Sequence, residues 1–234
     1  MNENSTEMLN IVSSVTKSGN IEIHMKESKY YYLPFDKSEV NFRDNKIRDR
    51  FVKSVEARVR NSPKYKQYIF YLKNTVGLDR CAVFGNIKSE EKKKTKIEMH
   101  HGPIFTMYDY ANIVLEKRLH DLNSDINTFD IAREVLLLHK RKLVQTVMLC
   151  ETAHLSMNNP KIAPFITQDQ TFGNLCGFLE EYHEYLLSEH VSKLKRYFEN
   201  YDKNVKDNTL NMFKPVFTKY NIIFSENKNG GIIK

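Results

Sequence analysis

The sequence lacks any long apolar run, and this excludes one class of protein at once. A helix that crosses a bilayer needs about 20 consecutive apolar residues, and no such run occurs in the 234 residues. The first seven residues, MNENSTE, are polar and acidic, whereas a secretory signal peptide starts with basic residues followed by apolar ones. We therefore predict no membrane partner and expect the protein in the cytoplasm, which for a phage-encoded protein is that of the host.

The sequence also contains few cysteines and lacks several motifs of enzymes and metal sites. The cysteines are Cys81, Cys150 and Cys176, which are too few for a disulfide framework and too scattered for a CxxC zinc motif. The sequence contains neither a glycine-rich phosphate loop nor a Ser/His/Asp order. Hydrophobic residues nevertheless make up 41% of the chain, which is enough for a packed core rather than a disordered chain.

What is abundant is positive charge, with a formal net charge of +7. Between Phe42 and Leu72, nine Lys or Arg face three Asp or Glu. Apolar residues at every fourth position predict an amphipathic helix here, ended by Ser62-Pro63; they are Ile47, Phe51, Val55 and Val59. We predict that cations of this helix and of a later charged turn bind nucleic acid; they are Arg48, Arg50, Lys53, Arg58, Arg60, Lys92, Lys93 and Lys94. A solvated helix face is the alternative.

The remaining pattern predicts a mixed α+β chain. We expect an irregular start with a strand at 20–25, and a hairpin of 80–87 with 96–101. Helices follow at 107–122 and 129–141, then a strand at 143–150, a short helix at 151–159, a long helix from about 172 to 201, and a loose tail at 225–234. We divide the chain into a basic helical arm (1–78), a core (79–160) and a helical segment with its tail (161–234).

Histidines at the end of one strand and on one helix form the candidate site. His100 and His101 are neighbours on a strand, so their side chains project to opposite faces. His154 and Asn158 are four residues apart on a helix and share a face. Such a set can hold a cation while one imidazole takes a proton from water. Glu98 lies on the same strand face as His100; we interpret it as solvated, with an acceptor for a ligating histidine as the alternative.

Two segments carry a resemblance to a known family. IEMHHGP at 97–103 and MLCETAHLSMN at 148–158 resemble the two halves of an HNH motif. The whole segment of about 80–159 is similar to HNH-type proteins encoded by bacteriophages. The resemblance implies a ββα-metal core with a helical insertion and flanking helices. It implies His101 as general base, Gln145 at the position that orients it, and a divalent ion held by His100, His154 and Asn158.

The activity implied by the resemblance is metal-dependent hydrolysis of phosphodiester bonds by an endonuclease. Mg²⁺ or Mn²⁺ is the expected ion, with Zn²⁺ as a further candidate, because an Asn ligand favours a hard cation. DNA is the expected substrate ahead of RNA. The alternative is a non-catalytic nucleic-acid-binding or virion-associated phage protein on the same scaffold. Two features favour it: Gln145 stands where the family has Asn, and a long insertion separates His101 from His154.

Overall fold

The computed structural model describes the backbone of residues 9–15 and 21–27, and most of the chain from 42 to 220. The ranges in this second part are 42–88, 96–121, 126–157, 159, 162–205 and 209–220, and the side chains of 202–204 and 209–212 are not described. The helices are α1 (Asn45–Asn61), α2 (Pro63–Asn74), α3 (Met107–His120), α4 (Thr128–Lys140), α5 (Glu151–Ser156), α6 (Leu175–Tyr182), α7 (Ser188–Asn204) and α8 (Thr209–Lys219), with 3-10 turns η2 (Gln168–Gln170) and η3 (His183–Tyr185). The strands are β1 (Leu9–Val15), β2 (Ile21–Glu27), β3 (Ile97–His101) and β4 (Thr146–Cys150). The α+β class is confirmed.

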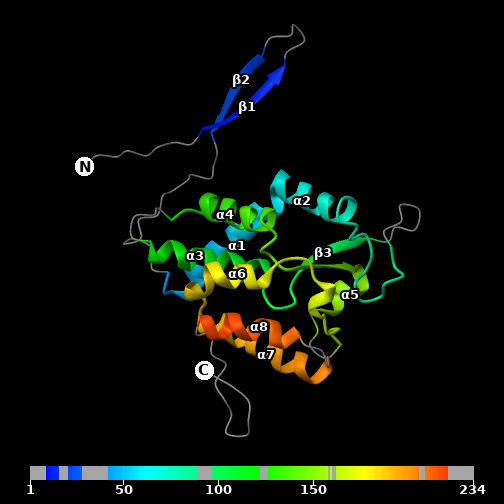
Figure 1. Ribbon diagram of the computed structural model, residues 1–234. Helices are drawn as coiled ribbons and strands as arrows, with labels where there is room; N and C mark the ends of the chain where they lie inside the picture. Colours follow the sequence, from blue (N-terminus) through cyan, green and yellow to red (C-terminus); the bar gives the residue numbers. More distant parts are fainter. Residues whose placement is uncertain are drawn as a thin grey trace.

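Helix α1 has one buried face and one charged face. It begins at Asp44, whose carboxylate accepts hydrogen bonds from two amides of the first turn and so satisfies N–H groups that have no partner within the helix. The buried face packs against α3 and α4 (Figure 1); it consists of Phe51, Val52, Val55 and Val59. Ile47, predicted to belong to this face, is 40% exposed, and Val52 is buried in its stead.

A single residue, Ser62, joins α1 to α2. Its amide donates to the carbonyl oxygen of Val59 and ends α1, and its hydroxyl accepts from the amide of Lys64 and starts α2. Pro63 follows at the first position of α2, where its missing N–H has no helical partner to lose. The predicted break at Ser62-Pro63 is confirmed.

Helices α3 and α4 lie beside α1 and contact each other. Helix α3 begins with a capping box: the Asp109 carboxylate accepts from the amide of Thr106 at 2.8 Å, and the Thr106 hydroxyl accepts from the amide of Asp109. Helix α4 begins at Asn127, whose side-chain oxygen accepts from the amide of Asp130 at 2.8 Å. Both helices lie where the sequence predicts them. Capping residues and apolar spacing are local signals, which can be recognised without the tertiary structure.

Strand β4 is buried at every residue and paired on both edges. On one edge β3 runs antiparallel to it, with Met99 opposite Met148. On the other edge Thr146 exchanges two 2.8 Å hydrogen bonds with Phe172, and the amide of Ala82 donates to the carbonyl oxygen of Met148 at 2.8 Å. Buried backbone groups need partners, so three distant segments converge on this strand.

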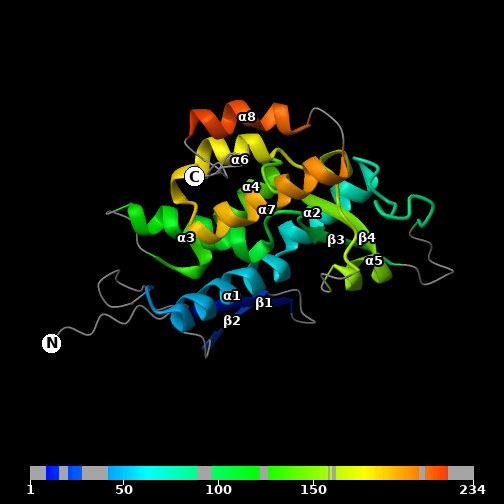
Figure 2. The same cartoon turned by 90° about the horizontal axis from the view of Figure 1, so that it is seen from below.

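The C-terminal helices cover the molecule on the side opposite α2 and α4, where α7 and α8 lie (Figure 1). Helix α6 contacts both α3 and α8, and α8 runs beside it in the view from below (Figure 2). Two amino-acid pairs in this region bind α7 to the rest: Lys193 donates to both carboxylate oxygens of Asp109 at 2.6 and 2.8 Å, and Tyr197 donates to the carbonyl oxygen of Ile166 at 2.9 Å.

Two predicted elements are wrong. Arg80 and Lys88 form an isolated bridge, and the predicted hairpin of 80–87 with 96–101 is absent from the described residues because β3 pairs with β4 instead. Alternation along a strand specifies its two faces but does not name its partner. The helix predicted over 172–201 is broken at η3, although neither glycine nor proline lies there. The break lets α6 and α7 both contact α3 side chains.

The N-terminal strands β1 and β2 form an antiparallel hairpin. Val12 lies opposite His24 in its register. Strand β2 agrees with the strand predicted at 20–25, whereas β1 was not predicted. The loose tail predicted at 225–234 lies outside the described residues.

Gly173 allows the chain to pass directly against the segment that precedes β4. Its φ is +129°, and a Cβ built on it would lie 2.7 Å from the carbonyl carbon of Val144. Real Cβ atoms do not come that close to backbone, so the pairing of Thr146 with Phe172 requires a glycine here.

We expect Gly173→Ala to destabilise the protein more than Gly77→Ala. Gly77 also has a positive φ, +85°, but a Cβ there would meet nothing within 4 Å. The Gly77 variant therefore carries conformational strain alone, about 1–2 kcal/mol. The Gly173 variant adds a clash with backbone, and overpacking typically costs about 1–3 kcal/mol. Urea unfolding measures both free energies, and equal losses would show that the segment around Gly173 can move away from β4.

Candidate functional site

His100 and His154 meet on the surface where β3 and α5 lie together. Their ring centroids are 5.0 Å apart, with the rings inclined at 73°. Nδ1 of His154 lies 2.7 Å from a carboxylate oxygen of Glu98. A carboxylate only accepts, so Nδ1 carries the proton, and the contact is the acceptor role that we gave as the alternative for Glu98. Burial, followed by repulsion from His154 and Arg60, lowers the pKa of His100 to about 4, so His100 is neutral at pH 7.

The structure describes only two of the three predicted metal ligands, His100 and His154. Among the residues that the structure describes, no group of three or more His, Cys, Asp or Glu is arranged to hold a metal ion. Asn158, predicted as a further ligand, lies outside the described residues. The metal-binding prediction is therefore not supported, and the ββα-metal core is not confirmed, although β3, β4 and α5 follow one another with α3 and α4 inserted between the strands.

His101 faces the opposite side of β3 and is buried. Its Nε2 lies 3.0 Å from Nε2 of His139, and Nδ1 of His139 lies 2.7 Å from the carbonyl oxygen of Val135. That carbonyl can only accept, so Nδ1 of His139 donates and its Nε2 accepts from His101. The ring of Tyr65 stacks on His101 with centroids 6.0 Å apart. With 4% of its surface exposed, His101 is enclosed by the core.

Gln145 is buried as well and is engaged elsewhere. Its side-chain nitrogen donates to the side-chain oxygen of Gln168 at 2.7 Å, and its backbone amide donates to the hydroxyl of Tyr110 at 2.9 Å. Its backbone carbonyl accepts from the amide of Gly102. Gln145 thus connects the segment before β4 with α3 and η2, and none of its hydrogen bonds to the described residues involves His101.

Four of the five predicted cations of α1 fall into two groups. Arg48 and Arg58 bind neighbouring helices: Arg48 donates to Asn112 and to Glu116 of α3, and the Arg58 guanidinium lies 3.8 Å from the centroid of the Phe129 ring. Within α1, two cations pair with carboxylates one turn earlier, Lys53 with Asp49 and Arg60 with Glu56.

Arg50 differs from the other four. It is exposed, and among the described residues its side chain forms no ion pair. The cations predicted in the charged turn, Lys92, Lys93 and Lys94, lie outside the described residues. The prediction that these cations bind nucleic acid stays a prediction, and Arg50 is the α1 member best placed for it.

The buried histidine pair should make stability depend on pH. Burial lowers the pKa of His139 to about 4 and holds the pKa of His101 well below its ordinary value. In the unfolded chain both titrate near about 6.5. Below that pH the unfolded chain binds protons that the folded pair excludes, so stability is fully present above about pH 6.5 and is lost as pH falls towards about 4.

We expect His139→Gln to flatten this dependence. Each such histidine contributes at most about 1.4 kcal/mol per pH unit in that window, and urea unfolding at pH 7 and pH 5 measures the difference. His120→Gln is the matched control, because His120 is exposed and should leave the wild-type dependence in place. If the His139 variant kept the wild-type dependence, the pair would already be protonated in the folded protein.

Comparison with known proteins assigns the chain to a family. A family model described as Bacteriophage G278-like virion protein matches residues 1–227. No curated protein and no solved structure matches the chain. The match spans nearly the whole chain, whereas the resemblance to HNH proteins rested on about 80–159. The helices of the described residues include none that is both long and apolar enough to cross a membrane.

This match overturns the nuclease interpretation. The predicted HNH membership, endonuclease activity and enzyme class are wrong. The catalytic roles of His101 and Gln145 were predicted for that reaction, so they have no reaction to serve. The match favours the alternative, a virion-associated protein without catalytic activity, and it indicates the virion rather than the cytoplasm as the protein's location. The chain belongs to the bacteriophage G278-like virion protein family.

Proposed function

We propose that this protein is a non-enzymatic component of the phage particle that contacts the packaged DNA through exposed cations of α1 and α2. The family match supports a place in the virion. The net charge of +7 supports a polyanionic partner. The burial of His101, the histidine predicted as general base, fits a protein that performs no hydrolysis.

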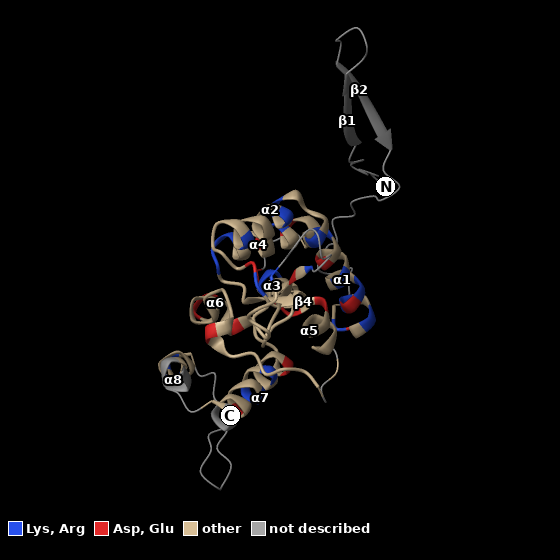
Figure 3. Ribbon diagram, turned by 90° about the vertical axis from the view of Figure 1, so that its right-hand side faces the viewer, with Lys and Arg blue, Asp and Glu red and all other residues tan. Residues whose placement is uncertain are grey.

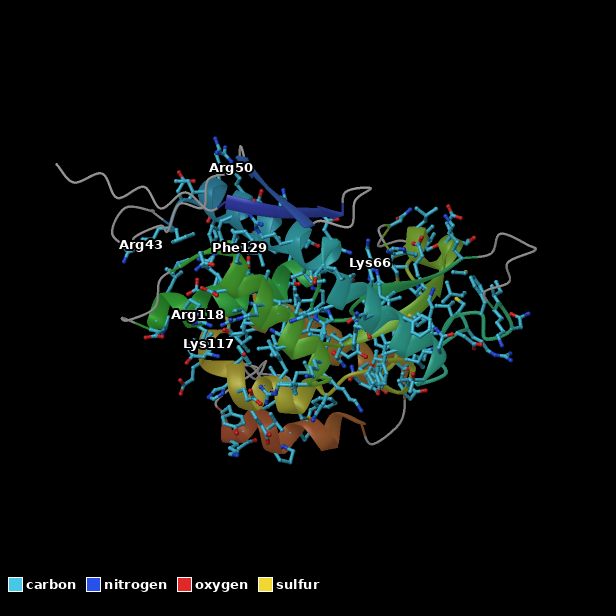
Figure 4. The ribbon with its side chains drawn as sticks, turned by 90° about the horizontal axis from the view of Figure 1, so that it is seen from above. Arg43, Arg50, Lys66, Lys117, Arg118 and Phe129 are labelled. Carbon is cyan, nitrogen blue, oxygen red and sulfur yellow. The ribbon has the colours of Figure 1, made fainter. Side chains whose placement is uncertain are left out.

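The observation that carries the proposal is a set of cations without counter-charges. Lys46 and Arg50 on α1, and Lys64 and Lys66 on α2, are exposed, and none forms an ion pair in the described part of the chain. Helix α2 contains neither Asp nor Glu. Figure 3 shows Lys and Arg on both helices, and Figure 4 labels Arg50 and Lys66 among them.

Cations of this kind bind phosphates by releasing the counter-ions condensed on nucleic acid. A cation already paired with a carboxylate contributes less, because the carboxylate repels the phosphate. Lys53 and Arg60 are in that position. In the alternative interpretation, a solvated helix face, the cations remain in water and bind no phosphate. The two interpretations therefore differ in how binding responds to salt.

We expect Arg50→Gln combined with Lys66→Gln to weaken binding of a labelled random-sequence duplex. Each lost phosphate contact reduces the slope of log affinity against log salt by about 0.9, so the pair should flatten it by about 1.8. Weakening should be alike for all sequences, because phosphate contacts carry no base information. Fluorescence anisotropy over a salt series gives both quantities.

The control is Lys195→Gln combined with Arg196→Gln on α7, which removes the same charge on the opposite side of the molecule from α2 (Figure 1). It should leave the slope close to that of the wild type. Failure of the wild-type protein to bind the duplex, or an equal effect of the two pairs, would contradict the proposed contact surface.

A further inference from the structure

A cavity of about 710 Å³ lies between α2 and α4. Small-molecule sites commonly enclose about 300–1,000 Å³, so it has room for a ligand of nucleotide size. Helix α2 contributes Lys64 and Tyr71 to its lining, and α4 contributes Arg133, Leu137 and Lys140. The cavity is separate from the surface where His100 and His154 meet. None of the predicted site residues lines it.

The charged residues that line this cavity are all cations. Its charged lining residues are Lys64, Arg133, Lys140 and Lys142, and no Asp or Glu belongs to the described lining. Lys64, Lys140 and Lys142 form no ion pair within the described residues, and Arg133 approaches Asp130 no closer than 4.0 Å. Four cations around one cavity repel one another, and a bound anion would remove that repulsion.

Lys64 is placed where a structural role would disfavour it. It lies in the first turn of α2, which contains no acidic residue. The helix dipole there favours negative side chains and opposes positive ones, typically by about 0.3–1 kcal/mol. A lysine at this position therefore costs helix stability, and an anion beside it would gain from both the lysine and the helix terminus.

Aromatic and aliphatic side chains also line the cavity. Tyr68, Tyr71 and Leu137 line it, with the ring centroids of the two tyrosines 6.5 Å apart. Leu137 is 49% exposed, which is unusual for a large apolar side chain in this molecule. His139 also lines the cavity, and burial lowers its pKa to about 4, so it adds no charge at neutral pH. The fitting ligand therefore joins an anionic group to a flat apolar one.

We infer that this cavity binds a single nucleotide unit, with its phosphate beside the lining cations and its base against Tyr71 and Leu137. A base stacked inside a duplex cannot enter, so the unit belongs to a single-stranded segment or strand end, or is a free nucleotide. The inference deepens the proposed function, since it adds a site for an unstacked nucleotide beside the surface for duplex DNA.

The experiment measures anisotropy of a short fluorescein-labelled oligothymidylate with the full chain. Lys64→Gln combined with Lys140→Gln should weaken binding at least about fivefold, while the pair at Lys195 and Arg196 leaves it unchanged. Tyr71→Leu keeps an apolar side chain but removes the ring, and should weaken oligothymidylate about fivefold or more with little effect on duplex. Unchanged oligothymidylate binding in the tyrosine variant would overturn the ring as a stacking surface, and urea unfolding of the same variant shows whether its fold is intact.

Competition separates the ligands that share this chemistry. Thymidine monophosphate should displace the oligonucleotide, whereas inorganic phosphate at the same concentration should not. Equal displacement by phosphate would overturn the role of the base, and equal displacement by polyaspartate would show a general anion surface and overturn the nucleotide assignment. Displacement by the monophosphate in full, with no preference for the oligonucleotide, would assign the cavity to free nucleotides.

The two proposals fail separately. If the pair at Arg50 and Lys66 flattens the salt dependence of duplex binding while Lys64→Gln with Lys140→Gln leaves oligothymidylate binding unchanged, the cavity inference is wrong and the proposed function stands. If the wild-type protein does not bind duplex DNA but binds oligothymidylate through the cavity, the proposed duplex surface is wrong and the cavity inference is supported.

Discussion

The complete burial of β4 is the constraint on which the centre of the molecule depends. A buried strand must satisfy its backbone groups on both edges, and here β3 occupies one edge while Phe172 and Ala82 occupy the other. The close passage of Gly173 follows from this pairing. The same pairing brings β3 beside α5, so the meeting of His100 with His154 is a consequence of how β4 is enclosed.

Alternation along β3 then divides two neighbouring histidines between different environments. His100 lies with Glu98 and His154 near the surface, whereas His101 lies in the core against His139 and Tyr65. A histidine pair at the end of a strand resembles a catalytic motif in the sequence, but the folded chain uses one member to fill and cross-link its interior. A buried imidazole is out of reach of the water and substrate that a general base must contact.

The distribution of carboxylates decides which cations remain available to a partner. On α1 most of the predicted cations are engaged by α3, by Phe129 and Thr128 near the start of α4, or by carboxylates one turn away. Three of the cations that line the cavity between α2 and α4, Lys64, Lys140 and Lys142, have no such partners in the described residues, and Tyr68 and Tyr71 line the same cavity. This distribution is the reason why we propose phosphate recognition between these two helices rather than along α1 alone.

The sequence by itself determined the elements whose signals are local. Caps and apolar spacing predict α1, α3 and α4 closely, and Ser62-Pro63 predicts the break before α2, because each of these depends on residues within a few positions. Tertiary structure alone decided the partner of β3, the break between α6 and α7, and the burial of His101. The cavity between α2 and α4 also belongs to this second group, because Lys64 and Lys140 become neighbours only through packing. A strand or helix pattern states which side is apolar, but the segment that covers that side is chosen by the folded chain as a whole.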